Sequence, residues 1–194
     1  MARSHMLAES GIAALAVDLY GNGITVETPE QAMAQAKPFY ENPNLGVQRL
    51  LKFKKLLTQD PLLSKQAKIY AIGYCFGGTQ VLNLARSGEK LAGIASFHGG
   101  LTTTMKNVKT IGTPLYVFNG EADPMVPKKD VEGFLEEMKK AHANVQLVNY
   151  PGALHAFSNP KATDVGKKFH LPVAYDEKAD KDSWEKLVSF LKSN

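Results

Sequence analysis

A cysteine flanked by glycines, between a strand-like run and a helix-like run, constrains this sequence most. The apolar run Ile69–Ile72 leads into residues 73–77, Gly-Tyr-Cys-Phe-Gly, and a helical pattern then continues to Arg86. A residue at the apex of such a turn has strained backbone angles, and glycines two positions before and after it remove side chains that would clash. The spacing G-x-C-x-G therefore predicts a nucleophile elbow with Cys75 at its apex.

The position of Cys75 also favours a reactive thiol. The first amides of the following helix point towards the cysteine, and their partial positive charge favours the thiolate, which is the nucleophilic form. A lone cysteine is often only a small buried apolar residue. The flanking glycines and the preceding strand favour the nucleophile over that structural alternative.

A nucleophilic thiol needs a base, and the base needs a carboxylate that holds it in one tautomer. Asp123 follows the apolar run Leu115–Asn119, and His155 follows the run Val145–Tyr150. Nucleophile, acid and histidine thus occur in the order typical of α/β-hydrolases. Taken singly, the aspartate could be a turn residue and the histidine a structural one. Glu121 competes for the acid role, but the proline that follows Asp123 favours Asp123.

The apolar pattern as a whole predicts an α/β fold with a mostly parallel sheet and helices on both faces, because short buried runs alternate with helical periodicity. The expected strands are Ile12–Val17, Ile69–Ile72, Leu91–Phe97, Leu115–Asn119 and Val145–Tyr150. The expected helices are 29–40, 47–57 and 79–86, one beginning near Lys128, and one around 184–191. Residues 158–182 are expected to form a long surface connection that borders a site.

Length and composition indicate one globular domain, expected over residues 7–194. The formal charge is +4, but the lysines are scattered among acidic residues, so no nucleic-acid binding is expected. No apolar run is long enough to predict a membrane span. The five histidines lack metal-binding spacing, no phosphate-binding or dinucleotide motif is complete, and no cofactor or metal is expected. Residues 1–6 are either a cloning remnant or the start of a first helix, and a cytoplasmic location is expected because no signal peptide is visible.

Several of these segments resemble dienelactone hydrolases, a family of the α/β-hydrolase superfamily. The resemblance is carried by the elbow and by the segments 119–123 and 151–157, together with Asp18-Leu19-Tyr20-Gly21 and the segment 96–100, Ser-Phe-His-Gly-Gly. It implies a hydrolase acting on carboxylic ester bonds, like a carboxymethylenebutenolidase, that cleaves esters or lactones through an acyl-thioester on Cys75. The catalytic residues would be Cys75, Asp123 and His155, and the Phe76 amide would lie in the oxyanion hole. Expected pocket residues are Tyr20, Phe39, Tyr40, His98, Met125 and Phe157, although His98 could equally have a structural role.

The sequence departs from the family's pattern at its beginning, where about three strands that the family places before Ile12–Val17 have no counterpart. The second oxyanion amide of α/β-hydrolases comes from a loop in that region. Activity is therefore expected to be reduced, and an impaired or non-catalytic binding protein is the alternative function. An unpaired sheet edge would favour homo-oligomers. The family's arginines that bind the substrate carboxylate have no clear match among Arg3, Arg49 and Arg86, so a broader ester or thioester preference is as consistent as dienelactone.

Overall fold

The computed structural model describes residues 2–193 as alternating helices and strands. The strands are β1 (Tyr70–Tyr74), β2 (Gly93–Phe97), β3 (Leu115–Gly120) and β4 (Val145–Tyr150). The helices are α1 (Ala2–Glu9), α2 (Pro29–Glu41), α3 (Pro43–Thr58), α4 (Phe76–Arg86), α5 (Lys128–Lys140), α6 (Ala162–Phe169) and α7 (Glu177–Ser193).

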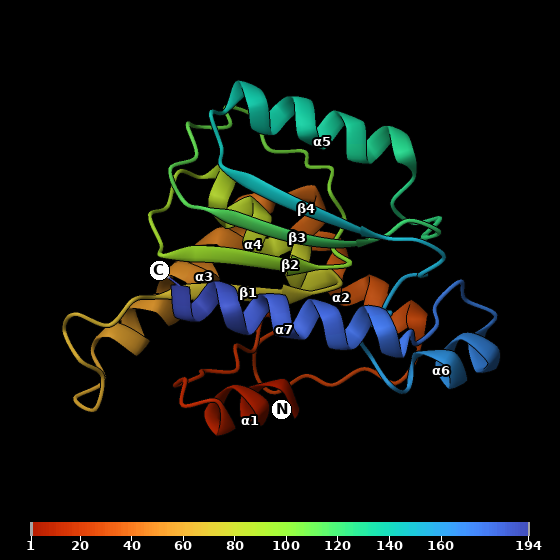
Figure 1. The fold of residues 1–194 in the computed structure, drawn as a ribbon, viewed down its shortest axis with the longest axis horizontal. Coiled ribbons are helices and arrows are strands. Elements are labelled where there is room, and N and C mark those ends of the chain that lie inside the picture. Colours follow the sequence, from red (N-terminus) through yellow and green to blue (C-terminus); the bar gives the residue numbers. More distant parts are fainter. Residues whose placement is uncertain (1, 194) are drawn as a thin grey trace.

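The four strands form one parallel sheet in the order β1-β2-β3-β4, visible at the centre of Figure 1. Neighbouring strands in the sequence are neighbours in the sheet, and parallel pairs need a crossover on one face. Since such crossovers are right-handed, successive connections that move the same way across the sheet lie on the same face. Accordingly α4 and α5 share one face, and α7 covers the other.

Alternating residues of the strands point to opposite faces of the sheet and pack into two separate apolar clusters. Leu115 and Val117 of β3 pack in the cluster with residues of α4 and α5, whereas Phe118 packs in the cluster with Leu187 of α7. All four side chains are at most 2% exposed. A strand buried on both faces reads as a continuous apolar run, which is why the sequence predicted this sheet. The α/β fold class with helices on both faces is confirmed.

Most of the predicted elements are present with shifted ends. The elbow helix begins at Phe76 rather than Thr79, and α3 begins at Pro43, inside the segment expected to separate two helices. Proline suits the first turn of a helix because the amide it lacks would have no partner there. Asn42 is thus both the C-cap of α2 and the N-cap of α3, so the expected break is a single residue.

The predicted strand Ile12–Val17 is wrong. Residues 12–17 pair with no strand of the described chain, and Leu15 is 45% exposed. A β-strand is defined by its hydrogen bonds to a neighbouring strand. Among the strands of residues 2–193, β1 pairs with β2 alone. A run of alanines with a few larger apolar side chains fits an exposed connection as well as a buried strand. Residues 12–17 and the elbow strand are therefore not directly paired.

The stretch 158–182 is more ordered than the expected surface connection. It contains the whole of α6 and the first turns of α7, and the segment between them returns to the region of His155. Two prolines and many charged residues in this stretch concealed α6, which is only eight residues long. The expectation that this stretch borders the site agrees with the bridge between His155 and Val173.

Residues 2–9 form helix α1, which contains most of the segment 1–6. Arg3 forms an ion pair with Asp180 of α7, and its guanidinium lies 5.1 Å from the centre of the Trp184 ring. Met1 lies outside the described residues. Among residues 2–193 no helix is both long and apolar enough to span a membrane.

Candidate active site

The carboxyl ends of all four strands contribute polar side chains to one region of the molecule. Cys75 follows β1 directly, His98 follows β2, Asp123 lies in the turn after β3, and His155 lies in the loop after β4. In open parallel sheets ligands bind beyond the carboxyl ends of the strands. The order of the sheet therefore brings together residues that are far apart in the sequence.

Cys75 occupies a strained turn between β1 and α4. Its φ of 51° and ψ of −119° fall outside the regions that side-chain-bearing residues normally adopt, and such strain costs about 1–3 kcal/mol. A Cβ atom on Gly73 would overlap the carbonyl of Gly77, so glycine is required there. The prediction that position 77 must also be glycine is wrong, because a Cβ atom on Gly77 would meet no atom within 4 Å. The tight packing lies one residue later, where Gly78 abuts Gly99.

Cys75, His155 and Asp123 form a chain of contacts. His155 Nε2 lies 3.0 Å from Cys75 Sγ, and His155 Nδ1 lies 2.7 Å from Asp123 Oδ2. The second carboxylate oxygen of Asp123 accepts a hydrogen bond of 2.8 Å from the Met125 amide, which fixes the carboxylate plane. Asp123 is 2% exposed and His155 is 7% exposed, so this part of the chain is shielded from water. Glu121, the competing acid, is exposed.

The thiol and the imidazole perturb each other's pKa in opposite directions. Burial of the Cys75 thiol by itself raises its pKa, but the hydrogen bond and charge of His155 and the hydrogen bond from the Phe76 amide outweigh burial, so the net pKa is lowered. Burial lowers the pKa of His155, yet its bonds to Asp123 and Cys75 raise it to about 10. These directions favour a thiolate–imidazolium pair at neutral pH. The residue as a whole remains accessible from the surface, although the surrounding protein desolvates its thiol group.

Three aromatic side chains surround the ring of Phe76, the residue after the nucleophile. The ring centroids of Tyr20, Phe39 and Tyr40 lie 5.5, 5.2 and 5.9 Å from that of Phe76. Burial and the nearby Cys75 charge raise the pKa of Tyr40 to about 12 and also raise that of Tyr20. Both phenols therefore stay protonated and can donate hydrogen bonds beside the thiol.

The loop that carries Tyr20 is held by two charged residues. Asp18 accepts hydrogen bonds from the amides of Gly21 and Gly23, both at 2.8 Å. Arg49 of α3 donates to the carbonyl of Leu19. The sequence match at residues 18–21 thus corresponds to a turn that places an aromatic ring next to the elbow.

His98 lies behind the elbow and is 3% exposed. Its Nδ1 accepts a hydrogen bond of 3.2 Å from the Cys75 amide, and its Nε2 lies 2.8 Å from Ser158 Oγ. Burial, followed by the charge of His155, lowers the pKa of His98 to about 3, so the ring is neutral. Sequence reasoning missed Ser158, since no spacing rule links a serine to a histidine sixty positions earlier.

The other two expected pocket residues, Met125 and Phe157, differ in their exposure to solvent. Met125 is 46% exposed beside the Asp123 turn, whereas Phe157 is fully buried and contacts the rings of His98 and Tyr150. Phe157 is therefore part of the core cluster under α7 rather than a surface that a ligand could touch.

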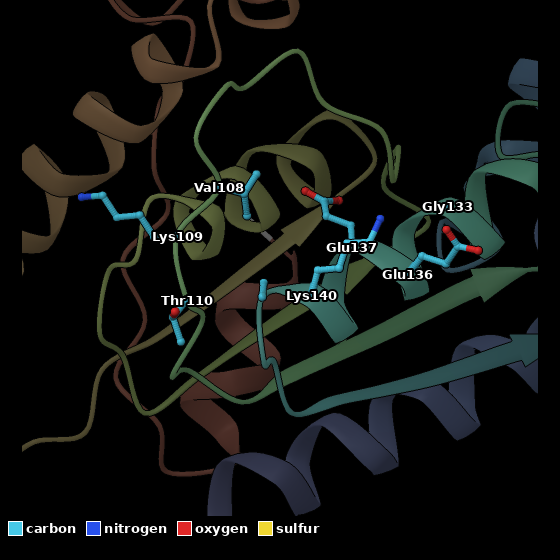
Figure 2. Close-up of a pocket in the computed structure, with 8 residues that line it drawn as sticks. Val108, Lys109, Thr110, Gly133, Glu136, Glu137 and Lys140 are labelled. Carbon is cyan, nitrogen blue, oxygen red and sulfur yellow. The ribbon is translucent and has the colours of Figure 1, made fainter.

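A surface hollow lies away from these residues. Figure 2 shows it between the loop at Val108 and Lys109 and the α5 residues Glu136 and Lys140. It contains none of the strand-end residues, and its lining charges are of both signs. Within residues 2–193 no group of three metal-ligating side chains is gathered in one place.

The chain is similar to known proteins over nearly its whole length. The sequence profile of the dienelactone hydrolase family matches residues 2–194. The chain belongs to the dienelactone hydrolase family. The resemblance that the elbow and the strand-end segments suggested is confirmed. Membership in this family supports a hydrolase activity for the chain.

Relatives of this dienelactone hydrolase family member share much of its length. An uncharacterized protein of Caenorhabditis elegans is 33% identical over 141 residues, which are 68% of this chain and 83% of the relative. A protein of Aquifex aeolicus that is provisionally named a carboxymethylenebutenolidase is 27% identical over 96% of this chain and 77% of its own. A solved dienelactone hydrolase-like promiscuous phosphotriesterase from metagenomic libraries is 30% identical with a TM-score of 0.90, covering 99% of this chain and 79% of its own.

Proposed function

We propose that this protein is a cysteine-dependent hydrolase of carboxylic esters or lactones that acts through an acyl-thioester on Cys75. The observation that carries the proposal is the 3.0 Å contact between Cys75 Sγ and His155 Nε2 on a strained elbow, with Asp123 behind the imidazole. A nucleophile, a base and a group that orients the base within hydrogen-bond reach are what acyl transfer requires.

In the first half-reaction the Cys75 thiolate attacks the carbonyl carbon of the ester. The carbonyl electron pair moves to the oxygen, where the Phe76 amide donates a hydrogen bond to the developing charge. When the tetrahedral intermediate collapses, the bond to the leaving alcohol breaks, and the His155 imidazolium gives its proton to the departing oxygen. The product is an acyl-thioester and a neutral imidazole.

In the second half-reaction water replaces the alcohol. Neutral His155 takes a proton from water as the water oxygen attacks the thioester carbonyl. The carbon–sulfur bond then breaks, the acid is released, and the thiolate and imidazolium re-form. Asp123 holds the imidazole with Nε2 directed at the sulfur throughout, so the proton moves between His155 and the reacting oxygens only.

All three arginines are already bound to other groups of the protein, which favours ester substrates without a free carboxylate. Arg86 is fully buried and bound to Glu137, Arg3 is paired with Asp180, and Arg49 binds the Leu19 carbonyl. The partly exposed rings of Tyr20 and Tyr40 beside Phe76 offer an apolar wall instead. We therefore expect neutral esters and lactones with apolar acyl groups to be better substrates than a carboxylate-bearing dienelactone.

The proposal relies on the Phe76 amide as an oxyanion donor, and the loss of one such donor costs about 100- to 1,000-fold in kcat. An impaired, ligand-binding protein with an intact elbow is the alternative function.

One experiment separates these two functions. Hydrolysis of p-nitrophenyl acetate is measured for the parent and for Cys75→Ala, in parallel with stoichiometric alkylation by iodoacetamide. Because Cys75 is the only cysteine of the sequence, alkylation reports on this thiol alone. We expect turnover in the parent and a fall of at least roughly 1,000-fold in the variant. Turnover that survives the substitution would overturn the cysteine mechanism, and complete alkylation without any turnover would favour the binding protein.

A further inference from the structure

Both ring nitrogens of buried His98 are engaged, and one of them holds the backbone of the nucleophile. The Cys75 amide donates to Nδ1 at 3.2 Å as well as to the Phe97 carbonyl at 2.9 Å. The other nitrogen, Nε2, faces Ser158 Oγ at 2.8 Å. The elbow therefore has a side-chain acceptor in addition to the ordinary parallel-sheet bond at this position.

These contacts define one tautomer. Nδ1 can accept a hydrogen bond only if it carries no proton. The ring proton of the neutral imidazole is therefore on Nε2, and this N–H group donates a hydrogen bond to Ser158 Oγ. The opposite tautomer would direct an N–H group of His98 at the N–H group of Cys75, so the Cys75 amide, which can only donate, selects the tautomer. The hydroxyl of Ser158, which is 4% exposed, accepts from Nε2 and holds the plane of the ring.

We propose that His98 is a positioning residue of the nucleophile elbow and that Ser158 holds its ring in the orientation in which Nδ1 accepts the Cys75 amide. The inference rests on the proposed function of Cys75 as nucleophile. It assigns His98 a place behind the reacting atoms, in contact with the backbone of the nucleophile, rather than in the substrate pocket.

The His98 acceptor helps to hold Cys75 in its strained backbone conformation. Fixing the Cys75 amide sets the rotation about its N–Cα bond, and this rotation directs Sγ towards His155 Nε2 and the Phe76 amide. A positive φ persists only where the surroundings over-determine it. His98 has a φ of 39° itself, and its amide donates to the Phe118 carbonyl at 2.8 Å, so the backbone behind the acceptor is also fixed.

The same serine is tied to the outer layer of the protein. The Ser158 carbonyl accepts a hydrogen bond of 2.7 Å from Arg3, whose guanidinium is paired with Asp180. Contacts thus continue from α1 and α7 through Ser158 and His98 to the nucleophile. This explains why a segment that lies far from Cys75 in the sequence bears on its geometry.

The first test compares Ser158→Ala with Ser183→Ala. Both substitutions remove one buried serine hydroxyl, but the Ser183 hydroxyl donates to the Asp180 carbonyl inside α7, away from the elbow. We expect Ser158→Ala to lower kcat by roughly 10- to 100-fold with little change in KM, because the reacting groups are misaligned rather than lost. Ser183→Ala should keep the parent's kcat.

The second measurement does not depend on turnover. The rate of Cys75 alkylation by iodoacetamide is followed against pH, and Ser158→Ala should move its inflection upward, because a displaced Sγ loses the contacts that stabilise the thiolate. The titratable groups that face Cys75 are the same in both variants: Tyr20, Tyr40, His98, Asp123 and His155. A loss of thermal stability alone would leave this inflection in place.

A pair of His98 variants checks the acceptor itself. His98→Asn keeps an acceptor near the place of Nδ1 and tolerates a positive φ, whereas His98→Leu keeps bulk without an acceptor. We expect the asparagine variant to retain most of the parent's alkylation profile and the leucine variant to lose it. The proposal is overturned if Ser158→Ala matches Ser183→Ala in both kcat and alkylation profile, a result that would leave Cys75 as the nucleophile. If His98→Leu does not fold, the serine pair still decides.

Discussion

The reactivity of Cys75 depends on how its charge is shared with His155. The hydrogen bond and charge of His155 outweigh burial and lower the pKa of the thiol, while the same contact helps to raise the pKa of His155. As pH falls, the thiolate is lost only on passing through its lowered pKa. Between this value and the ordinary thiol pKa of about 8.5, the protein should react as a thiolate where a free cysteine would not.

We therefore predict that Cys75 is alkylated rapidly at neutral pH and that His155→Asn moves the inflection of the alkylation rate upward. Without His155, burial and the negative charge of Asp123 raise the thiol pKa and only the Phe76 amide lowers it. Because burial is the largest of these effects, the inflection should reach or exceed that of a free thiol, about 8.5. His142→Asn is the control for the same substitution elsewhere, because His142 is exposed and asparagine tolerates its positive φ. An inflection that stays in place in His155→Asn would contradict the ion pair.

The two acidic residues after β3 should behave differently. Asp123 bonds to His155 at 2.7 Å, whereas Glu121 is exposed. Asp123→Asn should reduce kcat by at least roughly 100-fold, since an amide no longer favours the productive tautomer; in serine triads the equivalent loss reaches about 10,000-fold. Glu121→Gln, measured in the same ester assay, should have no effect. Equal losses in the two variants would mean that the reduction comes from the turn rather than from the carboxylate.

At the scale of elements, the elbow between β1 and α4 depends on one glycine more than on the other. A Cβ atom on Gly73 would overlap the Gly77 carbonyl, while the same atom on Gly77 would meet open space. We predict that Gly73→Ala destabilises the protein by about 1–3 kcal/mol, the usual cost of overpacking, and abolishes rapid alkylation. Gly77→Ala should fold with unchanged or slightly higher stability, since alanine suits a helix better than glycine.

Thermal unfolding and Cys75 alkylation measured together test this pair. The matched substitution at Gly77 controls for the general effect of adding a methyl group in the elbow. A stable, reactive Gly73→Ala protein would show that the turn has another conformation available.

The elements that the sequence predicted well are those whose signal is local. Apolar runs indicate the strands β3 and β4, and one apolar stripe indicates the helix α5. The proposed catalytic residues Cys75, Asp123 and His155 each follow a strand, in an order that the sequence alone displays. The exposed run 12–17 carries the same local signal, but whether a run becomes a strand depends on neighbours that no local pattern specifies. The contacts of Ser158 and Arg3 are tertiary in the same sense, and no spacing predicts them.

At the scale of the whole molecule, the sheet ends at β1, and the nearby apolar run 12–17 forms no strand within residues 2–193. A surface hollow is lined by Ala14 and Ala16 together with residues of α1, so apolar groups there are open to solvent. Edge strands and exposed apolar segments recruit other chains unless charge or proline protects them. These features favour self-association of this protein.

We predict that the apparent mass measured by light scattering rises with protein concentration towards that of a dimer, and that Leu15→Lys suppresses this rise. A lysine at Leu15, which is 45% exposed, places a charge in the apolar run at little cost to the fold. Leu62→Lys is the matched control, because Leu62 is 94% exposed and lies in the loop before β1. If the protein is monomeric at every concentration, or if both lysine variants dissociate it equally, pairing through residues 12–17 is excluded and the sheet tolerates its open edge alone.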